Sequence, residues 1–315
     1  MGKMESKKSN GKPRIFHEAL NPHFGYYYTI DKSLYAGQTR FQKIEVIETP
    51  ELGRVLLLDG ITQVAEKNEF QYHEPMVHPA VIAHPDPRRV LVVGGGDGCI
   101  LRELLKYAAI EQIDFVELDE GVIDCAKKYF AHQNQNAFDD ERVAIHITDG
   151  RQFVEKAQKS YDIVIMDMTD PFGPSKFLYT REFFQHIQNA LRDKNGIFVM
   201  HSESPISRPA AYACILKTLS AVFNQVVPLF IYIQMYAVLW SISLAGNSEL
   251  PATIAADAVD AKLVDHGLSN LKVFNGQTFE AMRVAYPYID EIRLSQGRVI
   301  TDAAPDFPDD FLMKG

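Results

Sequence analysis

Carboxylates gather in this sequence at places where chemistry on a cationic ligand could occur. A glycine-rich segment, residues 94–98, carries one acid, and Glu117 follows it. Residues 167–174 read Asp-Met-Thr-Asp-Pro-Phe-Gly-Pro and place Asp170 three positions after Asp167. Carboxylates attract a sulfonium or an ammonium group, and they can take a proton from an amine. The acids therefore indicate a site for a positively charged ligand.

The glycine segment favours a nucleoside sulfonium over a dinucleotide. Gly94, Gly96 and Gly98 let backbone N–H groups come close to a ligand. The dinucleotide fingerprint G-x-G-x-x-G would need its last glycine where Cys99 stands. Asp97 would repel a pyrophosphate but attract a cation. The pattern is closer to the G-x-G-x-G of enzymes that bind a nucleoside sulfonium.

Two further acids are placed to hold the nucleoside. Glu117 ends an expected strand, where a carboxylate can accept hydrogen bonds from both ribose hydroxyls. Asp149 and Gly150 follow another expected strand, and the Asp149 carboxylate could accept from an adenine amino group. A solvated surface charge is the alternative at a strand end. The position of Glu117 after the glycine turn favours ribose binding.

The acids at Asp167 and Asp170 have two interpretations. Asp-x-x-Asp-Pro suits a helix cap and turn. Ligands, however, bind at the carboxyl ends of parallel strands, so we expect a rigid acidic lip that faces the glycine turn. Upstream, residues 68–74 add Tyr72, His73 and further acids near the first strand.

Strands and helices alternate around these residues and must position them. Short apolar runs predict strands buried on both faces, at residues 89–93, 112–118, 143–147, 161–166, 196–200 and 226–232. Apolar spacing predicts helices at residues 99–105, 122–130 and 152–157. This alternation predicts a doubly wound, mainly parallel sheet.

The first part of the chain has a different pattern. Residues 26–64 are rich in β-branched and aromatic side chains, and strands at 44–49 and 54–58 joined by a turn predict a small antiparallel unit. We expect a disordered basic tail over residues 1–14, an N-terminal β domain over 15–75 and a Rossmann-like catalytic domain over 76–315.

Composition narrows the class of protein. The 315 residues hold 32 Lys and Arg against 41 Asp and Glu, a net charge of -9, which argues against a nucleic-acid partner. Cys99, Cys125 and Cys214 lack the spacing of a disulfide framework or a structural zinc site, so we expect a reducing, cytoplasmic setting and no metal. Apolar runs stop short of the roughly 18–20 residues of a membrane span, so we expect no membrane association.

Several motifs together resemble the spermidine synthase family of polyamine aminopropyltransferases, from about Ser33 to Trp240. The motifs that carry the resemblance are Thr39-Arg40-Phe41-Gln42, Leu58-Asp59-Gly60-Ile61-Thr62-Gln63, Glu69-Phe70-Gln71-Tyr72-His73-Glu74, Gly94-Gly95-Gly96-Asp97-Gly98, Glu117-Leu118-Asp119, Asp149-Gly150 and Asp167-Met168-Thr169-Asp170-Pro171-Phe172-Gly173-Pro174. Their order along the chain makes coincidence implausible.

The resemblance implies a small N-terminal antiparallel β domain plus a class I methyltransferase-like Rossmann domain, assembled as a homodimer or homotetramer. It implies that decarboxylated S-adenosylmethionine donates an aminopropyl group to a small di- or polyamine, with release of methylthioadenosine and with Asp167 as the general base. The residues implied to hold this donor are Gln42, Gly94, Gly96, Asp97, Gly98, Glu117, Asp149 and Gly150. Those implied to bind the amine are Gln63, Tyr72, Asp170 and Tyr236.

The sequence departs from the family mostly on the amine side. The family's W-Y-T-E looks like residues 27–30 here, without the acid and one aromatic. Its E-x-x-W-L appears at residues 203–207 without the Trp, and its P-T-Y-P-S-G loop appears at residues 234–238, shorter and without prolines. Cys99 replaces a family glycine after the turn. The identity of the acceptor amine is therefore left open.

Two other functions fit the same scaffold. An amine N-methyltransferase would use intact S-adenosylmethionine. The negative charge of Asp97 would repel the methionine carboxylate of that donor. A non-catalytic polyamine-binding protein would explain the altered amine-side loops, but the presence of both Asp167 and Asp170 favours an enzyme.

Overall fold

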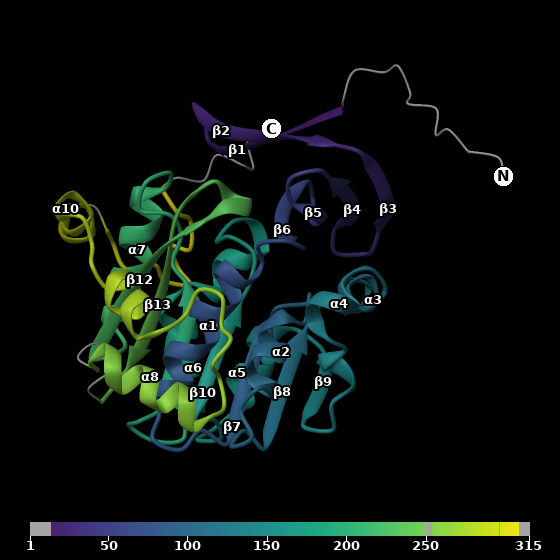
Figure 1. The fold of residues 1–315 in the computed structure, drawn as a ribbon. Coiled ribbons are helices and arrows are strands. Elements are labelled where there is room, and N and C mark those ends of the chain that lie inside the picture. Colours follow the sequence, from purple (N-terminus) through teal and green to yellow (C-terminus); the bar gives the residue numbers. More distant parts are fainter. Residues whose placement is uncertain (1–13, 249, 251–253, 296, 309–315) are drawn as a thin grey trace.

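The computed structural model describes residues 14–248, 250, 254–295 and 297–308 (Figure 1). The tail expected over residues 1–14 therefore lies outside the described residues, except for Arg14, which begins the first strand. The boundary expected between residues 75 and 76 stays a prediction.

The N-terminal part consists of antiparallel strands, as the sequence predicts. A hairpin of β1 (Arg14–Asn21) and β2 (Phe24–Ile30) precedes a four-stranded sheet in the order β3-β4-β5-β6. The strands of this sheet are β3 (Lys32–Gln38), β4 (Lys43–Thr49), β5 (Gly53–Leu58) and β6 (Ile61–Ala65). Gly53 has a φ of 74°, which closes the turn expected between β4 and β5.

The second part is built on a seven-stranded sheet of the described residues, in the order β12-β13-β11-β10-β7-β8-β9. The strands are β7 (Arg89–Gly94), β8 (Gln112–Glu117), β9 (Val143–Ile147), β10 (Ile163–Asp167), β11 (Ile197–His201), β12 (Gln225–Ile233) and β13 (Val238–Gly246). Neighbours from β9 to β11 pair in parallel, and β13 runs antiparallel to β11 and β12. The prediction of a mainly parallel Rossmann-like sheet is confirmed.

Helices cover this sheet, and three of them lie where the sequence predicts helices, at residues 99–105, 122–130 and 152–157. They include α2 (Cys99–Leu105), α3 (Glu120–Tyr129), α4 (Ala131–Asn134), α5 (Gly150–Lys156), α6 (Arg181–Ala190), α7 (Pro209–Ser220), α8 (Ala256–Asp265), α9 (Gly276–Met282) and α10 (Pro287–Ser295). The segment 135–140, between α4 and β9, contains a short 3-10 turn at Ala137–Asp139. No helix in the described ranges combines the length and the apolar character that crossing a membrane requires.

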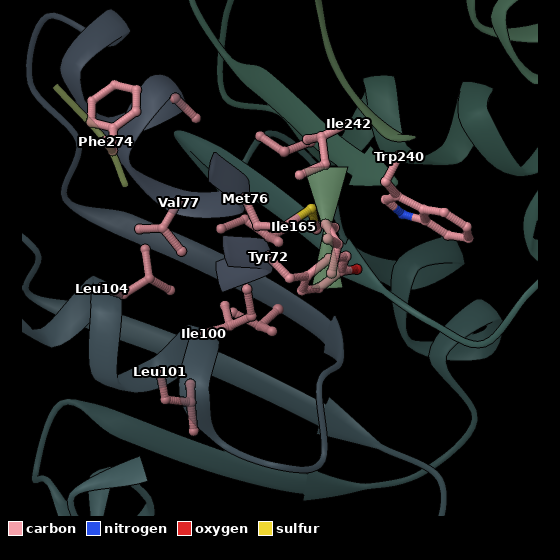
Figure 2. Packing of buried hydrophobic residues seen from close by; sticks show 14 of the residues in the cluster. Tyr72, Met76, Val77, Ile100, Leu101, Leu104, Ile165, Trp240, Ile242 and Phe274 are labelled. Carbon is pink, nitrogen blue, oxygen red and sulfur yellow. The ribbon is translucent and has the colours of Figure 1, made fainter. Parts of the chain in front are cut away.

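The longest helix of the described residues is one of those that the sequence does not predict. Helix α1 (Phe70–Ala83) contains Pro75 and Pro79, and it is buried over almost its whole length. Figure 2 shows Val77 of this helix beside Leu104 of α2 and Met76 near Ile165 of β10, within the main hydrophobic core. A helix that is apolar on most sides and interrupted by prolines has weak periodicity, which is why the sequence pattern did not reveal it.

Helix α1 also fastens the C-terminal segment to the core. The Glu74 carboxylate accepts hydrogen bonds from three successive backbone N–H groups, those of residues 272–274, at 2.7 to 2.9 Å. Glu74 is buried, so these bonds replace the water that its charge would otherwise need. Helix α1 is therefore held firmly, and its first turn carries side chains of the candidate site.

Candidate active site

The glycine turn lies directly against the end of β10. Gly94, Gly95 and Gly98 have φ values of 80°, 75° and 80°, a region that favours glycine. The Gly95 N–H donates to the backbone oxygen of Asp167 at 2.8 Å, and Gly94 pairs with Asp167 in the sheet. The turn and the first acid of residues 167–174 are thus neighbours, as the sequence predicts.

The Asp167 carboxylate is positioned by α1. Tyr72 donates its hydroxyl to Asp167 Oδ1 at 2.7 Å. Burial, together with the charge of Asp97, raises the pKa of Asp167 to about 6, although His73 and the Tyr72 hydroxyl act in the opposite direction. A carboxylate with this pKa is ionised at pH 7 and yet basic enough to accept a proton.

Asp97 faces a histidine that the sequence analysis mentions without giving it a role. His73 Nε2 lies 3.5 Å from Asp97 Oδ2, and His73 Nδ1 lies 2.8 Å from Glu69 Oε2. Burial would lower the pKa of His73, but the charges of Asp97 and Glu69 raise it to about 10. Burial would likewise raise the pKa of Asp97, and His73 with the Cys99 amide holds it below its ordinary value. Asp97 is therefore a carboxylate at neutral pH.

Glu117 lies on the other side of the glycine turn, where the sequence predicts it. A Cβ placed on Gly96 would lie 3.0 Å from Glu117 Oε2 and 2.6 Å from Val122 Cγ1, so this approach requires glycine. Glu117 Oε1 accepts from the Asp119 N–H at 3.0 Å, and burial raises the pKa of Glu117 to about 7. Gln42, from the N-terminal sheet, donates its side-chain N–H to Asp119 Oδ2 at 3.0 Å and so reaches the same edge.

Asp149 and Gly150 lie where β9 gives way to α5. The Asp149 carboxylate accepts from the Gln152 N–H at 2.9 Å and caps the helix. A Cβ on Gly150 would lie 2.6 Å from Val93 Cγ1, so the helix begins close to β7. Both residues stand at the carboxyl edge that carries Glu117, and adenine binding by Asp149 stays a prediction.

A series of aromatic rings extends from Tyr72, which contacts Asp167. The ring centroid of Tyr236 lies 6.2 Å from that of Tyr72 and 5.1 Å from that of Trp240. The Tyr236 hydroxyl donates to the backbone oxygen of Gln63 at 2.9 Å. The structure thus brings Tyr72 and Tyr236 together near Asp167, and Gln63 meets Tyr236 through its backbone oxygen.

Asp170 differs from the expected arrangement. Its Oδ2 accepts from Arg208 Nη1 at 2.8 Å, and the same nitrogen lies 3.4 Å from Glu203 Oε1. The lip expected to face the glycine turn is therefore formed by Asp167, whereas Asp170 is paired with an arginine 38 positions further on. Nothing in the local pattern around Arg208 or Glu203 identified this pairing.

The sequence analysis also missed Glu18, which the hairpin brings to the amine side. Its Oε2 accepts from the Thr62 N–H at 2.9 Å. Burial raises the pKa of Glu18 to about 7, with a smaller contribution from Asp170. Residues 27–30 in the second strand of the hairpin lack the acid of the family's W-Y-T-E motif. The first strand, β1, instead supplies the carboxyl group of Glu18.

Some of these side chains could in principle ligate a metal ion. Three groups in the described part of the chain bring candidate ligand atoms within 4.8 Å of one another: Glu69, His73 and Cys99; His73, Asp97 and Asp167; and Asp170, His201 and Glu203. Arg102 already binds both oxygens of Glu69 at 2.9 Å, so the first group is an ion-pair network. The expectation of no metal stays a prediction.

Comparison with known families and proteins finds clear similarity. Residues 69–255 match the family described as spermine/spermidine synthase domain, and residues 15–66 match the spermidine synthase tetramerisation domain. The polyamine aminopropyltransferase of Nitrosomonas europaea is 38% identical over 275 residues, covering 87% of this chain and 84% of that protein. Polyamine aminopropyltransferase 2 of Hyperthermus butylicus is 38% identical over 254 residues, covering 80% of this chain and 83% of that protein.

Solved structures are similar over nearly the whole length. The crystal structure of a spermidine synthase in complex with the transition-state analogue AdoDATO superposes with a TM-score of 0.83 at 31% identity, covering 91% of this chain and 98% of that one. The spermidine synthase of Thermotoga maritima gives a TM-score of 0.82 at 31% identity, with coverages of 91% and 97%.

Proposed function

The chain belongs to the spermine/spermidine synthase family, and we propose that its site moves the aminopropyl group of decarboxylated S-adenosylmethionine onto a small amine. It is a polyamine aminopropyltransferase, and what the proposal adds is the part that each side chain plays. The observation that carries the proposal is the Asp167 carboxylate, which lies close to the glycine turn and accepts from the Tyr72 hydroxyl, with its pKa raised to about 6.

The glycine turn with its acids would hold the donor. Gly94, Gly96 and Gly98 allow the nucleoside to approach the backbone, and Glu117 would accept from its ribose hydroxyls. Asp149 with Gly150 would meet the adenine, and Gln42 would close this edge from the N-terminal sheet. Asp97 would bind the ammonium of the aminopropyl group, because it is ionised and lies close to Asp167.

The reaction is an in-line displacement at carbon. The nitrogen of the acceptor attacks the methylene group next to the sulfonium, a C–N bond forms and the C–S bond breaks. The bonding electron pair returns to sulfur, so neutral methylthioadenosine leaves without needing an acid. The proton on the attacking nitrogen passes to the Asp167 carboxylate.

The acceptor presents the main energetic difficulty. An alkyl ammonium with a pKa near that of lysine is free amine in about one part in a thousand at pH 7, a cost of roughly 4 kcal/mol. Asp167 would offset this cost by accepting the proton, and Tyr72 keeps the carboxylate in position. Tyr236 and Gln63 would shape the channel for the amine, and Asp170 would act on its far end.

The test pairs two donors with a panel of amines. Decarboxylated and intact S-adenosylmethionine are each incubated with diamines and longer polyamines, and products are identified by mass spectrometry. We expect an aminopropylated amine and methylthioadenosine from the decarboxylated donor. A methylated amine from the intact donor would support the N-methyltransferase instead, and binding without any product would support the polyamine-binding protein.

We also propose that the enzyme assembles as a homotetramer in the cytoplasm. The tetramerisation domain match over residues 15–66 supports an oligomer, and Phe24 and Tyr27 of the hairpin are 59% and 66% exposed. Cys99, Cys125 and Cys214 are buried and form no disulfide bond, which fits a reducing compartment. Analytical ultracentrifugation distinguishes a tetramer from a dimer, and cell fractionation tests the location.

A further inference from the structure

A buried cation lies among the carboxylates on the acceptor side. Arg208 is the residue before α7, and its side chain is 6% exposed. Nη1 lies 2.8 Å from Asp170 Oδ2 and 3.4 Å from Glu203 Oε1. One guanidinium group therefore serves two carboxylates, of which the Glu203 side chain is fully buried.

Contacts from other elements fix the position of this guanidinium group. Arg208 Nε donates to the backbone oxygen of Leu20 in β1 at 3.2 Å. The guanidinium carbon lies 4.5 Å from the centroid of the Phe172 ring, which belongs to the loop after β10. The hairpin contacts the neighbouring residue as well, because Asn21 donates to the Ser207 oxygen at 3.4 Å. A side chain held in this way is a fixed charge.

The fixed charge lies beside Asp170, whose own charge reaches Tyr236 on the acceptor side. Oxygens of Asp170 and Glu203 and a ring nitrogen of His201 lie within 4.8 Å of one another. Burial, followed by the charges of Asp167 and Asp170, raises the pKa of the Tyr236 hydroxyl, so both acids are close to this ring. An amine with its reacting nitrogen at Asp167 and its chain along Tyr236 would extend toward Asp170.

The charges at this end can be counted from the described side chains. Asp170 and Glu203 contribute two negative charges and Arg208 contributes one positive charge. His201 adds no charge at neutral pH, because burial lowers its pKa. The cluster of Asp170, Glu203 and Arg208, here called the acceptor triad, therefore carries one net negative charge, and Glu18, whose pKa burial raises to about 7, stands near Asp170 as a carboxyl group outside the triad.

We propose that Arg208 is a specificity-determining residue that selects acceptors with one cationic group beyond the reacting nitrogen. A diamine brings one distal ammonium, which matches the single negative charge of the acceptor triad. A triamine brings a second cation to a region where a guanidinium group already stands, and like charges repel strongly in buried surroundings. The inference rests on the proposed transfer to an amine and adds the charge rule for that amine.

The test changes the net charge of the acceptor triad in steps. Arg208→Gln makes it −2, Asp170→Asn makes it 0, and the double variant returns it to −1, while Arg208→Lys keeps it at −1. For each variant, kcat/KM is measured with decarboxylated S-adenosylmethionine and a diamine, a triamine containing that diamine, and a monoamine of matching length.

We expect acceptor preference to follow the charge. Arg208→Gln should raise the triamine-to-diamine ratio of kcat/KM by about tenfold or more, and Asp170→Asn should raise the monoamine-to-diamine ratio by a similar factor. The double variant should recover most of the wild-type ratio, and Arg208→Lys should stay close to it. A purely structural role for Arg208 does not predict recovery on removing a second charged group.

Several results would overturn the inference. Wild-type enzyme that uses the triamine as well as the diamine contradicts it at once. So does an Arg208→Gln variant that loses activity with all amines by one common factor, or a double variant that keeps the altered ratio. If Arg208→Gln does not fold, as judged by its thermal unfolding, Asp170→Asn and the double variant still decide the question. A wild-type enzyme without transfer to any amine would instead refute the proposed function.

Discussion

Replacing Asp167 by Asn tests the proposed proton acceptor with the smallest change of shape. The Asn side chain keeps an oxygen that can accept the Tyr72 hydroxyl, which lies 2.7 Å from Asp167 Oδ1 in the present structure. The site should therefore keep its geometry and its binding of the donor. What is lost is the negative charge that takes the proton, and general base catalysis contributes about 10²–10⁴-fold. We expect kcat to fall by that factor while the donor Kd changes little.

The pH dependence of the wild-type enzyme gives an independent measure of the same group. Because burial and Asp97 raise the pKa of Asp167 to about 6, the active ionised form is lost as the pH falls through that value. At pH 5 about one-tenth of Asp167 would remain ionised, so kcat/KM should fall about tenfold per pH unit below the midpoint. Asp167→Asn should abolish this dependence along with most of the activity.

Tyr72→Phe supplies the matched control for this reasoning. The Tyr72 hydroxyl lowers the pKa of Asp167 by donating to its ionised form. Its removal should raise the pKa of Asp167 and move the acid limb of the profile to higher pH, with activity preserved on the alkaline side. Single-turnover rates measured from pH 5 to 9 give both the acid limb of the profile and the activity on its alkaline side. Near-normal turnover of Asp167→Asn, or an acid limb that does not move in Tyr72→Phe, would refute the role of Asp167.

Other substitutions test the donor side and the framework. Gly96→Ala places a methyl group 2.6 Å from Val122 Cγ1, so we expect the donor KM to rise about tenfold with the amine KM unchanged. His73→Gln removes the cation that lowers the pKa of Asp97, so donor affinity in calorimetry should fall and depend more on pH between 4 and 7. Glu74→Gln loses charge-assisted bonds to three backbone N–H groups, which should lower the free energy of unfolding by about 2–4 kcal/mol in urea titrations, and an unchanged midpoint would contradict this.

Local features of the sequence were sufficient to place most strands of the framework, the glycine turn and the acids at the strand ends. A strand buried on both faces needs a continuous apolar run, as at residues 89–93, and a turn with positive φ needs glycine, as at Gly94. Both requirements act within a few residues, so they leave a visible pattern. Glu117 and Asp167 could be placed for the same reason, because each directly ends a predicted strand.

Helix α1 and the arrangement of the amine side left no such local pattern in the sequence. Helix α1 is buried on most sides, so its apolar residues show no helical stripe, and the role of His73 depends on the fold that brings Asp97 to it. The pKa of Asp167 depends on burial and on Asp97, which is 70 positions away in the chain. Each of these effects depends on residues that are distant in the chain, so no short segment of the sequence reveals it.

The sequence alone determined which chemical groups are available: a glycine turn, acids at strand ends and aromatic residues suited to a cationic donor and an amine. Only the tertiary structure decided which charges meet. Asp170 and Asp167 are the same residue type three positions apart, yet Asp170 pairs with Arg208, whereas burial and Asp97 raise the pKa of Asp167. The physical reason is that charge interactions in a buried site depend on distance and solvent exposure, and the fold sets both.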